Sequence, residues 1–195
     1  MMVQLFGGAL TAELPSSFCD VSKLREVPDN QEVFMENSDD MLSFIFELLE
    51  HGDAPGKTAA QFHFESLVDD NDAVASTIWS EEDIETSKLS HIASLGDNAS
   101  VCRLTGFQQL PRDRHHTIRT LLQNIAVILY VIRCPKYQVD MVASLNVPLR
   151  NDYTDKEPLA VASLTADDAQ RFERAGQCID AFADSLTLVR PSLFG

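Results

Sequence analysis

Short stretches of alternating apolar and polar residues dominate the first 50 positions of the chain and predict β-strands. Two of them, near 3–6 and 9–14, are separated by a pair of glycines. Because glycine accepts positive φ without strain, this pattern predicts a β-hairpin. A proline then ends the second strand, and a single helical turn is expected after it, with Asp20 or Ser22 as its cap.

The segment 41–50 fits two periods. Its apolar residues alternate as in a strand, yet several of them also fall on one face of a helix. It follows the alternating stretch 31–36 after the turn-forming sequence NSDD. Because it is rich in aromatic residues and follows so short a turn, we expect 41–50 to be a strand that forms a hairpin with 31–36.

A helix is predicted over 58–70, because Thr58 and Gln61 have the spacing of a capping box. One face of this helix carries the apolar residues Ala60, Phe64, Leu67 and Val68. Phe62 lies off that face. A strand near 75–79 and an acidic segment without a clear period, 80–97, are expected to follow.

The second half of the chain predicts three strands in series, at 100–110, 117–134 and 137–149. The middle one is apolar over most of its length, which implies a sheet covered on both faces. Thr165 and Asp168 are expected to cap a final helix, whose apolar residues recur at gaps of three and four. Strands joined by hairpins, with helices before and after them, indicate an α+β fold built on an antiparallel sheet with helices on both faces.

The length of 195 residues and the apolar content of 45% fit one globular domain, 1–195. The four cysteines lie far apart without any C-x-x-C pair, so reduced thiols are expected. No stretch has the ~20 apolar residues of a membrane span, and the first residues lack the pattern of a signal peptide. We therefore expect a nuclear or cytoplasmic protein that does not insert into membranes.

The net charge of −15 is unevenly distributed along the chain. Up to Asp97 there are 20 acidic and 4 basic residues, whereas the remainder has 10 acidic and 11 basic residues. Such a distribution disfavours nucleic acid and anionic membranes as partners and suits a basic protein surface. A solvated acidic face that keeps the protein soluble is the alternative explanation.

The sequence motifs of common enzyme classes are missing. There is no P-loop, no dinucleotide-binding glycine pattern, no G-x-S-x-G and no H-E-x-x-H. No set of nucleophile, base and orienting residue can be assembled either. We therefore expect no enzyme activity, no cofactor and no metal site.

Several motifs, in the same order over nearly the whole chain, resemble the Ran guanine nucleotide release factor family: LFGGAL, DVSKLREVPDNQEVF, FIFELLE, AAQFHFESL, YQVDMVASLNVPL and the terminal SLF. Segments 72–97 and 151–164 contribute nothing to this resemblance. The resemblance implies a PsbP-like α/β sandwich with a curved antiparallel sheet. It also implies a monomer of the nucleus and cytoplasm that binds the small GTPase Ran, promotes release of guanine nucleotide, mainly GTP, and supports nuclear protein import.

The same resemblance places the Ran-binding region in the acidic half, from DVSKLREVPDNQEVF through FELLE to the FHFE helix. The residues it implies as Ran contacts are Asp20, Asp29, Glu32, Glu47, Glu50, Phe62 and Glu65. Pro28 is expected to stiffen the turn that presents Asp29 and Glu32. Phe62 fits an aromatic anchor at the interface or a second layer of packing. An adaptor or trafficking protein of the same fold, binding another basic protein, is the alternative function.

Overall fold

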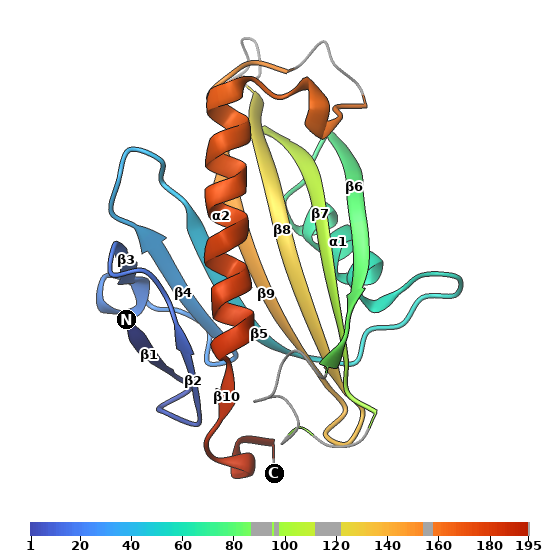
Figure 1. Cartoon of the computed structure of the whole chain (residues 1–195). Coiled ribbons are helices and arrows are strands. Elements are labelled where there is room, and N and C mark those ends of the chain that lie inside the picture. Colours follow the sequence, from blue (N-terminus) through green and yellow to red (C-terminus); the bar gives the residue numbers. More distant parts are fainter. Residues whose placement is uncertain (87–94, 96–97, 112–121, 154–157, 195) are drawn as a thin grey trace.

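The computed structural model describes residues 1–86, 95, 98–111, 122–153 and 158–194. Seven antiparallel strands form the main sheet, in the order β3-β4-β5-β9-β8-β7-β6 (Figure 1). The bounds of these strands are β3 Phe18–Asp20, β4 Gln31–Glu36, β5 Ser43–Glu50, β6 Ala75–Ile84, β7 Ser100–Pro111, β8 Leu122–Cys134 and β9 Val139–Pro148. The predicted antiparallel sheet is confirmed, and so is the strand, rather than a helix, at 43–50.

A second, three-stranded sheet lies beside β4 and contains the first and the last strand of the chain (Figure 1). Its strands are β1 Met2–Leu5, β2 Leu10–Glu13 and β10 Thr187–Leu188, in the order β1-β2-β10. The predicted hairpin is confirmed: Leu5 pairs with Leu10, and the turn between them places Gly7 and Gly8 at φ values of 62° and 81°. The pairing of β2 with β10 was not predicted.

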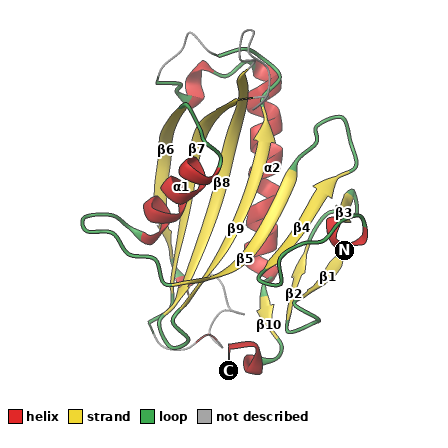
Figure 2. Cartoon of the chain, turned by 180° about the vertical axis from the view of Figure 1, so that it is seen from behind, coloured by secondary structure: helices red, strands yellow, loops and turns green. Residues whose placement is uncertain are grey.

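The two helices cover opposite faces of the main sheet, as a comparison of Figures 1 and 2 shows. Helix α1 spans Ala59–Asp70 and packs over β7 and β8, whereas α2 spans Ala166–Ser185 and packs over β8 and β9. The predicted helices on both faces are therefore confirmed. Short 3-10 helices lie at η1 Val21–Lys23, η4 Val161–Ser163 and η5 Pro191–Phe194.

Aromatic rings fill the space between the sheet and α2. Phe44 and Phe46 lie two positions apart on β5, so both point to this face, and both are fully buried. Their ring centroids lie 4.5 Å and 5.3 Å from that of Phe182 on α2. Burial of each aromatic side chain contributes on the order of a few kcal/mol to stability. A strand places Phe44 and Phe46 together in this cluster, which explains why the segment 43–50 forms a strand and not a helix.

On the other face, Phe64 joins α1 to the sheet at a glycine. A Cβ atom on Gly106 of β7 would lie 2.7 Å from the ring of Phe64 and 2.9 Å from the carbonyl oxygen of Thr77. Both contacts are far shorter than a van der Waals contact, so a larger residue at this position would push the helix away. The glycine thus allows α1 to approach the sheet closely.

The prediction for 75–97 was partly wrong. Strand β6 does not end near position 79 but continues to Ile84, with a register shift between Ile78 and Ser80. The prediction stopped there because residues 80–83 are all polar or acidic, although the strand continues to alternate between half-buried and exposed positions as far as Glu82. Residues 87–94, 96–97 and 117–121, for which other predictions were made, lie outside the described residues. In the described part of the chain, no helix is long and apolar enough to cross a membrane.

Candidate functional site

The structure divides the predicted contact residues between the two faces of the sheet. Glu32 pairs with Phe46 across β4 and β5, whereas Gln31 pairs with Glu47. Because side chains alternate along a strand, Glu32 points to the α2 face and Glu47 to the α1 face. The seven predicted residues therefore do not form one surface.

Glu32 and Asp20 make contacts within the protein. The Glu32 carboxylate accepts a hydrogen bond from the backbone N–H of Phe6 and so ties the N-terminal hairpin to the main sheet. Burial raises the pKa of Glu32 above its ordinary value, although this hydrogen bond opposes the shift. Asp20 caps η1, as predicted, by accepting from the N–H of Ser22 at 2.9 Å. Both carboxylates thus have structural roles that the sequence pattern did not separate from binding.

Glu47 is half-buried on the face of β5 that carries α1. Its carboxylate accepts a hydrogen bond of 2.6 Å from the side-chain amide of Gln31. Burial raises the pKa of Glu47, the Gln31 hydrogen bond opposes this, and the negative charge of Asp70 at the end of α1 raises it further. Asp70 is exposed, and it was not among the predicted contacts. The negative charge of Asp70 on the helix therefore acts on Glu47 on the strand.

The turn before β4 lies along the last residues of β5. Gln31 donates to the carbonyl of Pro28 at 2.9 Å to close this turn, and Asn30 exchanges hydrogen bonds with Leu48 of β5. Asp29 is exposed on the turn, and Glu50 is exposed at the end of β5. We call Asp29, Glu47, Glu50 and Asp70 the acidic corner. Asp29 lies on this turn, Glu47 and Glu50 lie on the second half of β5 with side chains on opposite faces, and the charge of Asp70 acts on Glu47.

Phe62 and Glu65 lie on α1 beside the acidic corner. The ring of Phe62 packs over Gly52, where an added Cβ would lie 1.9 Å from the ring. Phe62 is half-buried, so part of its ring forms a second packing layer, and the rest of the ring is exposed. Glu65 forms an ion pair with Lys57 in the loop before the helix, and both side chains remain well exposed.

A buried carboxylate fixes α1 and the end of β5 relative to each other. Asp140 on β9 is fully buried; its Oδ2 lies 2.8 Å from Nε2 of His63 on α1. Arg133 on β8 donates to both oxygens of this carboxylate, at 2.9 Å and 2.8 Å. Burial opposes ionisation of Asp140, but the hydrogen bonds from His63 and Arg133 prevail and lower its pKa to about 2.

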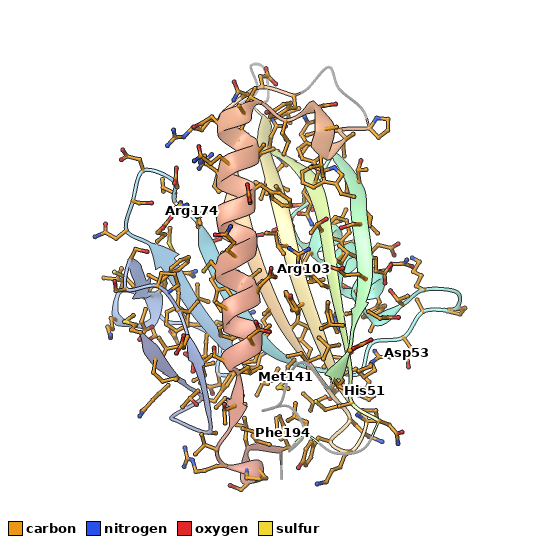
Figure 3. All side chains as sticks on the ribbon, in the orientation of Figure 1. His51, Asp53, Arg103, Met141, Arg174 and Phe194 are labelled. Atoms are coloured by element: carbon orange, nitrogen blue, oxygen red, sulfur yellow. The ribbon has the colours of Figure 1, made fainter. Side chains whose placement is uncertain are left out.

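The same network holds the loop that follows β5. Arg133 donates to the carbonyl of Gly52 at 2.6 Å and to Asp53 at 2.7 Å. His51, shown with Asp53 at the lower end of the sheet in Figure 3, has Nε2 3.7 Å from the Asp140 carboxylate. We call His63, Arg133 and Asp140 the polar anchor. The sequence offered one signal for it, an aspartate inside the apolar stretch YQVDMVASL, but nothing that identified its partners.

Arginines of the second half neutralise part of the acidic first half. Arg174, labelled in Figure 3, extends from α2 to Glu36 on β4 at 3.3 Å, and Arg171 binds Asp40 at 2.8 Å. Arg103 pairs with Glu82 at 3.6 Å. The uneven charge along the sequence is therefore not one uniformly acidic face in the fold, and the acidic corner is a local feature.

The family model for the Ran-interacting Mog1 protein matches residues 3–148, about three quarters of the chain. The chain belongs to this family. Nuclear import protein mog1 of Schizosaccharomyces pombe is 36% identical over 195 residues, covering 99% of this chain and 100% of the relative. Ran guanine nucleotide release factor of Homo sapiens is 32% identical over 194 residues, covering 98% of this chain and 95% of the relative.

A solved structure of the Saccharomyces cerevisiae Ran-binding protein Mog1p has the same fold. The two chains superpose with a TM-score of 0.71 at 24% identity, over 100% of this chain and 98% of the other. The predicted α+β class and family are thus confirmed.

The matched region of the Mog1 family contains the acidic corner and the polar anchor. It ends before α2, although Phe182 of that helix is part of the aromatic core. Among the described residues, no group of three or more His, Cys, Asp or Glu side chains is arranged to hold a metal ion. All four cysteines are free thiols, of which Cys19 is exposed.

Proposed function

We propose that this protein binds the GTPase Ran, promotes release of its guanine nucleotide, mainly GTP, and so supports nuclear protein import. Membership of the Mog1 family carries this proposal, because relatives that match nearly the whole chain are named for nuclear import and Ran guanine nucleotide release. The protein acts as a monomeric regulator in the nucleus and cytoplasm, and it performs no covalent chemistry itself.

The acidic corner is the proposed contact surface for Ran, with Phe62 and Glu65 of α1 at its border. A GTPase holds its nucleotide through backbone amides, a lysine and Mg²⁺ around the phosphates. A partner that presents carboxylates competes for such positive groups or disfavours the conformation that holds the metal. Glu47 suits this role because burial and the negative charge of Asp70 both disfavour its carboxylate, so a cation bound at Glu47 offsets these unfavourable interactions.

The energy required is moderate. To weaken a nucleotide from nanomolar to micromolar affinity, the partner must bind the nucleotide-free form more tightly by about 4 kcal/mol. By thermodynamic linkage, GTP then weakens the binding of the partner by the same factor. A single exposed ion pair contributes at most about 1 kcal/mol, so several carboxylates of the acidic corner must act together.

The deciding experiment measures release of a fluorescent GTP analogue from Ran with and without the protein. Acceleration that saturates with protein concentration, together with a stable complex with nucleotide-free Ran, is expected. If neither release nor complex formation is seen, the proposal fails.

Charge reversal tests the surface. Glu50→Lys and Glu47→Lys are each expected to weaken Ran binding about tenfold or more at low salt, and less at high salt, because ionic screening reduces the contribution of exposed charges. Glu173→Lys is the matched control, since it makes the same charge change at an exposed site on α2. Equal losses in the control and the corner variants would mean that net charge alone matters, and no loss in the corner variants would place the site elsewhere.

Glu32 provides a second contrast. Glu32→Gln preserves the size of the side chain and acts on the hairpin contact with Phe6, so we expect it to alter stability and leave Ran affinity within about twofold, as for other sites outside an interface. A strong loss of affinity in a folded Glu32→Gln protein would return this residue to the contact surface.

A further inference from the structure

Two unpaired strand edges face one cavity at the side of the molecule that carries the N-terminal sheet. Strand β1 ends the small sheet and β3 ends the main sheet, and both lie at the same side of the molecule in Figures 1 and 2. Met2 and Gln4 of β1 and Cys19 of β3 line a cavity of about 810 Å³ between them. We call this cavity the edge groove.

The backbone of β1 presents hydrogen-bonding groups to the edge groove. Met1 and Leu14 exchange backbone hydrogen bonds, with 3.0 Å between the Leu14 nitrogen and the Met1 oxygen. In an antiparallel pair such exchanges alternate from residue to residue, so Met2 and Gln4 direct their N–H and C=O groups away from β2. An extended chain is the ligand that satisfies groups in this arrangement.

The side chains around the edge groove are unusually apolar for a surface. Of the nine large hydrophobic residues that are exposed in the described part of the chain, four line it: Met1, Met2, Leu24 and Met35. Leu24 has 83% of its surface exposed. Clustered exposed apolar residues mark interaction sites more often than single ones do.

The other two edge strands are less suited to accept another chain, since β10 has only two residues and the edge of β6 is protected. Strand β6 ends the other side of the main sheet, and its ladder is irregular between Ile78 and Ser80. Three consecutive acidic residues, 81–83, follow on the same strand. Irregular pairing and charge are the usual means of preventing a strand edge from accepting another chain. Strands β1 and β3 carry no comparable charge cluster within the described residues.

Charge indicates one end of the ligand. Lys23 lines the edge groove with 77% of its side chain exposed, and its ion pair with Asp20 is long, at 3.8 Å. It is one of only four basic residues up to Asp97. Asp20 and Glu36 also line the edge groove, but Glu36 is bound by Arg174, so Lys23 is the exposed charge that an acidic residue of a ligand would complement.

We propose that the edge groove binds an extended peptide segment of a partner protein by strand addition to β1. The peptide has apolar side chains at alternate positions, which contact Leu24 and the methionines, and an acidic residue near Lys23. The edge groove contains none of the acidic-corner residues.

A random octapeptide library displayed on phage, selected on the full-length protein, tests the proposal. Enriched sequences are expected to alternate apolar and polar residues and to carry an acidic residue at one end. Binding of the enriched peptides is then measured by fluorescence anisotropy. Leu24→Asp is expected to weaken it at least tenfold, whereas Val74→Asp, a matched change at an exposed valine on the loop before β6, should not.

A second pair of variants tests the backbone contact. Gln4→Pro removes the outward N–H of an edge strand, a position that tolerates proline, and Gln4→Ala keeps it. We expect Gln4→Pro to bind at least tenfold more weakly than Gln4→Ala, with circular dichroism used to verify that both fold. The proposal is overturned if selection yields no alternating sequences, if Leu24→Asp binds the peptides as the unmodified protein does, or if folded Gln4→Pro and Gln4→Ala bind equally.

Discussion

Replacing Asp140 by asparagine removes the charge at the centre of the polar anchor while keeping the size of the side chain. The carboxylate is fully buried and receives hydrogen bonds from His63 and Arg133. In Asp140→Asn the guanidinium of Arg133 loses its principal counter-charge and retains the exposed Asp53 and the carbonyl of Gly52.

The magnitude follows from the pKa of Asp140. A pKa of about 2 in the folded protein, against an ordinary value of 3.8, corresponds to roughly 2.5 kcal/mol of stabilisation at neutral pH. Because the folded-state pKa is lowered, this stabilisation is complete above about pH 5 and is lost as the pH falls toward 2. Breaking a buried charged pair adds the cost of the unpaired partner, so we expect Asp140→Asn to lower the free energy of unfolding by about 3 kcal/mol at pH 7.

Urea denaturation at pH 7 and pH 3 measures this effect. The difference between the unmodified protein and Asp140→Asn should shrink by about 1 kcal/mol at pH 3, where part of the charge contribution has already gone. Asp53→Asn is the control: its carboxylate is 80% exposed, so it should cost less than about 1 kcal/mol. If the loss in Asp140→Asn is below about 1 kcal/mol, or is the same at both pH values, the charged anchor is not what stabilises this region.

Three further variants test the packing and the site. Gly106→Val drives a side chain into the ring of Phe64 and should lower the urea-unfolding free energy by about 2 kcal/mol; an unchanged midpoint would contradict the close approach of α1. Asp168→Ala deprives the N–H of Arg150 and the hydroxyl of Tyr153 of a buried acceptor and should cost about 3 kcal/mol, measured by thermal melting. Burial raises the pKa of Glu47, so Glu47→Gln should leave stability at pH 7 equal or higher and remove the stabilising contribution that protonation of Glu47 makes on acidification, while Ran binding weakens. Lower stability together with intact binding would refute both halves of that expectation.

The sequence predicted those elements whose signals are local. The cap of α1 is an example, since the Thr58 side chain accepts from the N–H of Gln61 at 3.1 Å as the capping-box spacing implied. The side chain of Thr165 likewise accepts from Asp168 at the start of α2. Strands β3 and β10 were missed because three and two residues are too few to display a period. Their pairing depends on where distant strands lie, which no local pattern encodes.

The candidate site was only partly predictable for the same reason. The spacing of Glu47 and Glu50 was recognised, but three positions along a strand turn the two side chains to opposite faces. Asp70 joins Glu47 only because α1 folds back over the sheet. The contact between His63 and Asp140 spans 77 positions, so neither residue could be assigned a partner from its neighbours.

The polar anchor and the acidic corner together explain why charged groups are placed at the junction of α1 and β5. An apolar group at position 140 could pack against the sheet equally well, because buried ion pairs are often no more stabilising than apolar packing. It could not, however, bind the carbonyl and side chain of the loop at Gly52 and Asp53 through Arg133 while also holding His63 of α1. A carboxylate shared between two cationic or polar partners fixes both elements in direction as well as in distance.

The acidic corner combines a strand end, a turn and a helix end, and carboxylates carried by separate elements act together on one partner only if those elements keep a constant spacing. Loss of the anchor should therefore weaken the proposed Ran contact without changing any exposed charge, whereas reversal at Glu50 changes the charge and leaves the spacing intact.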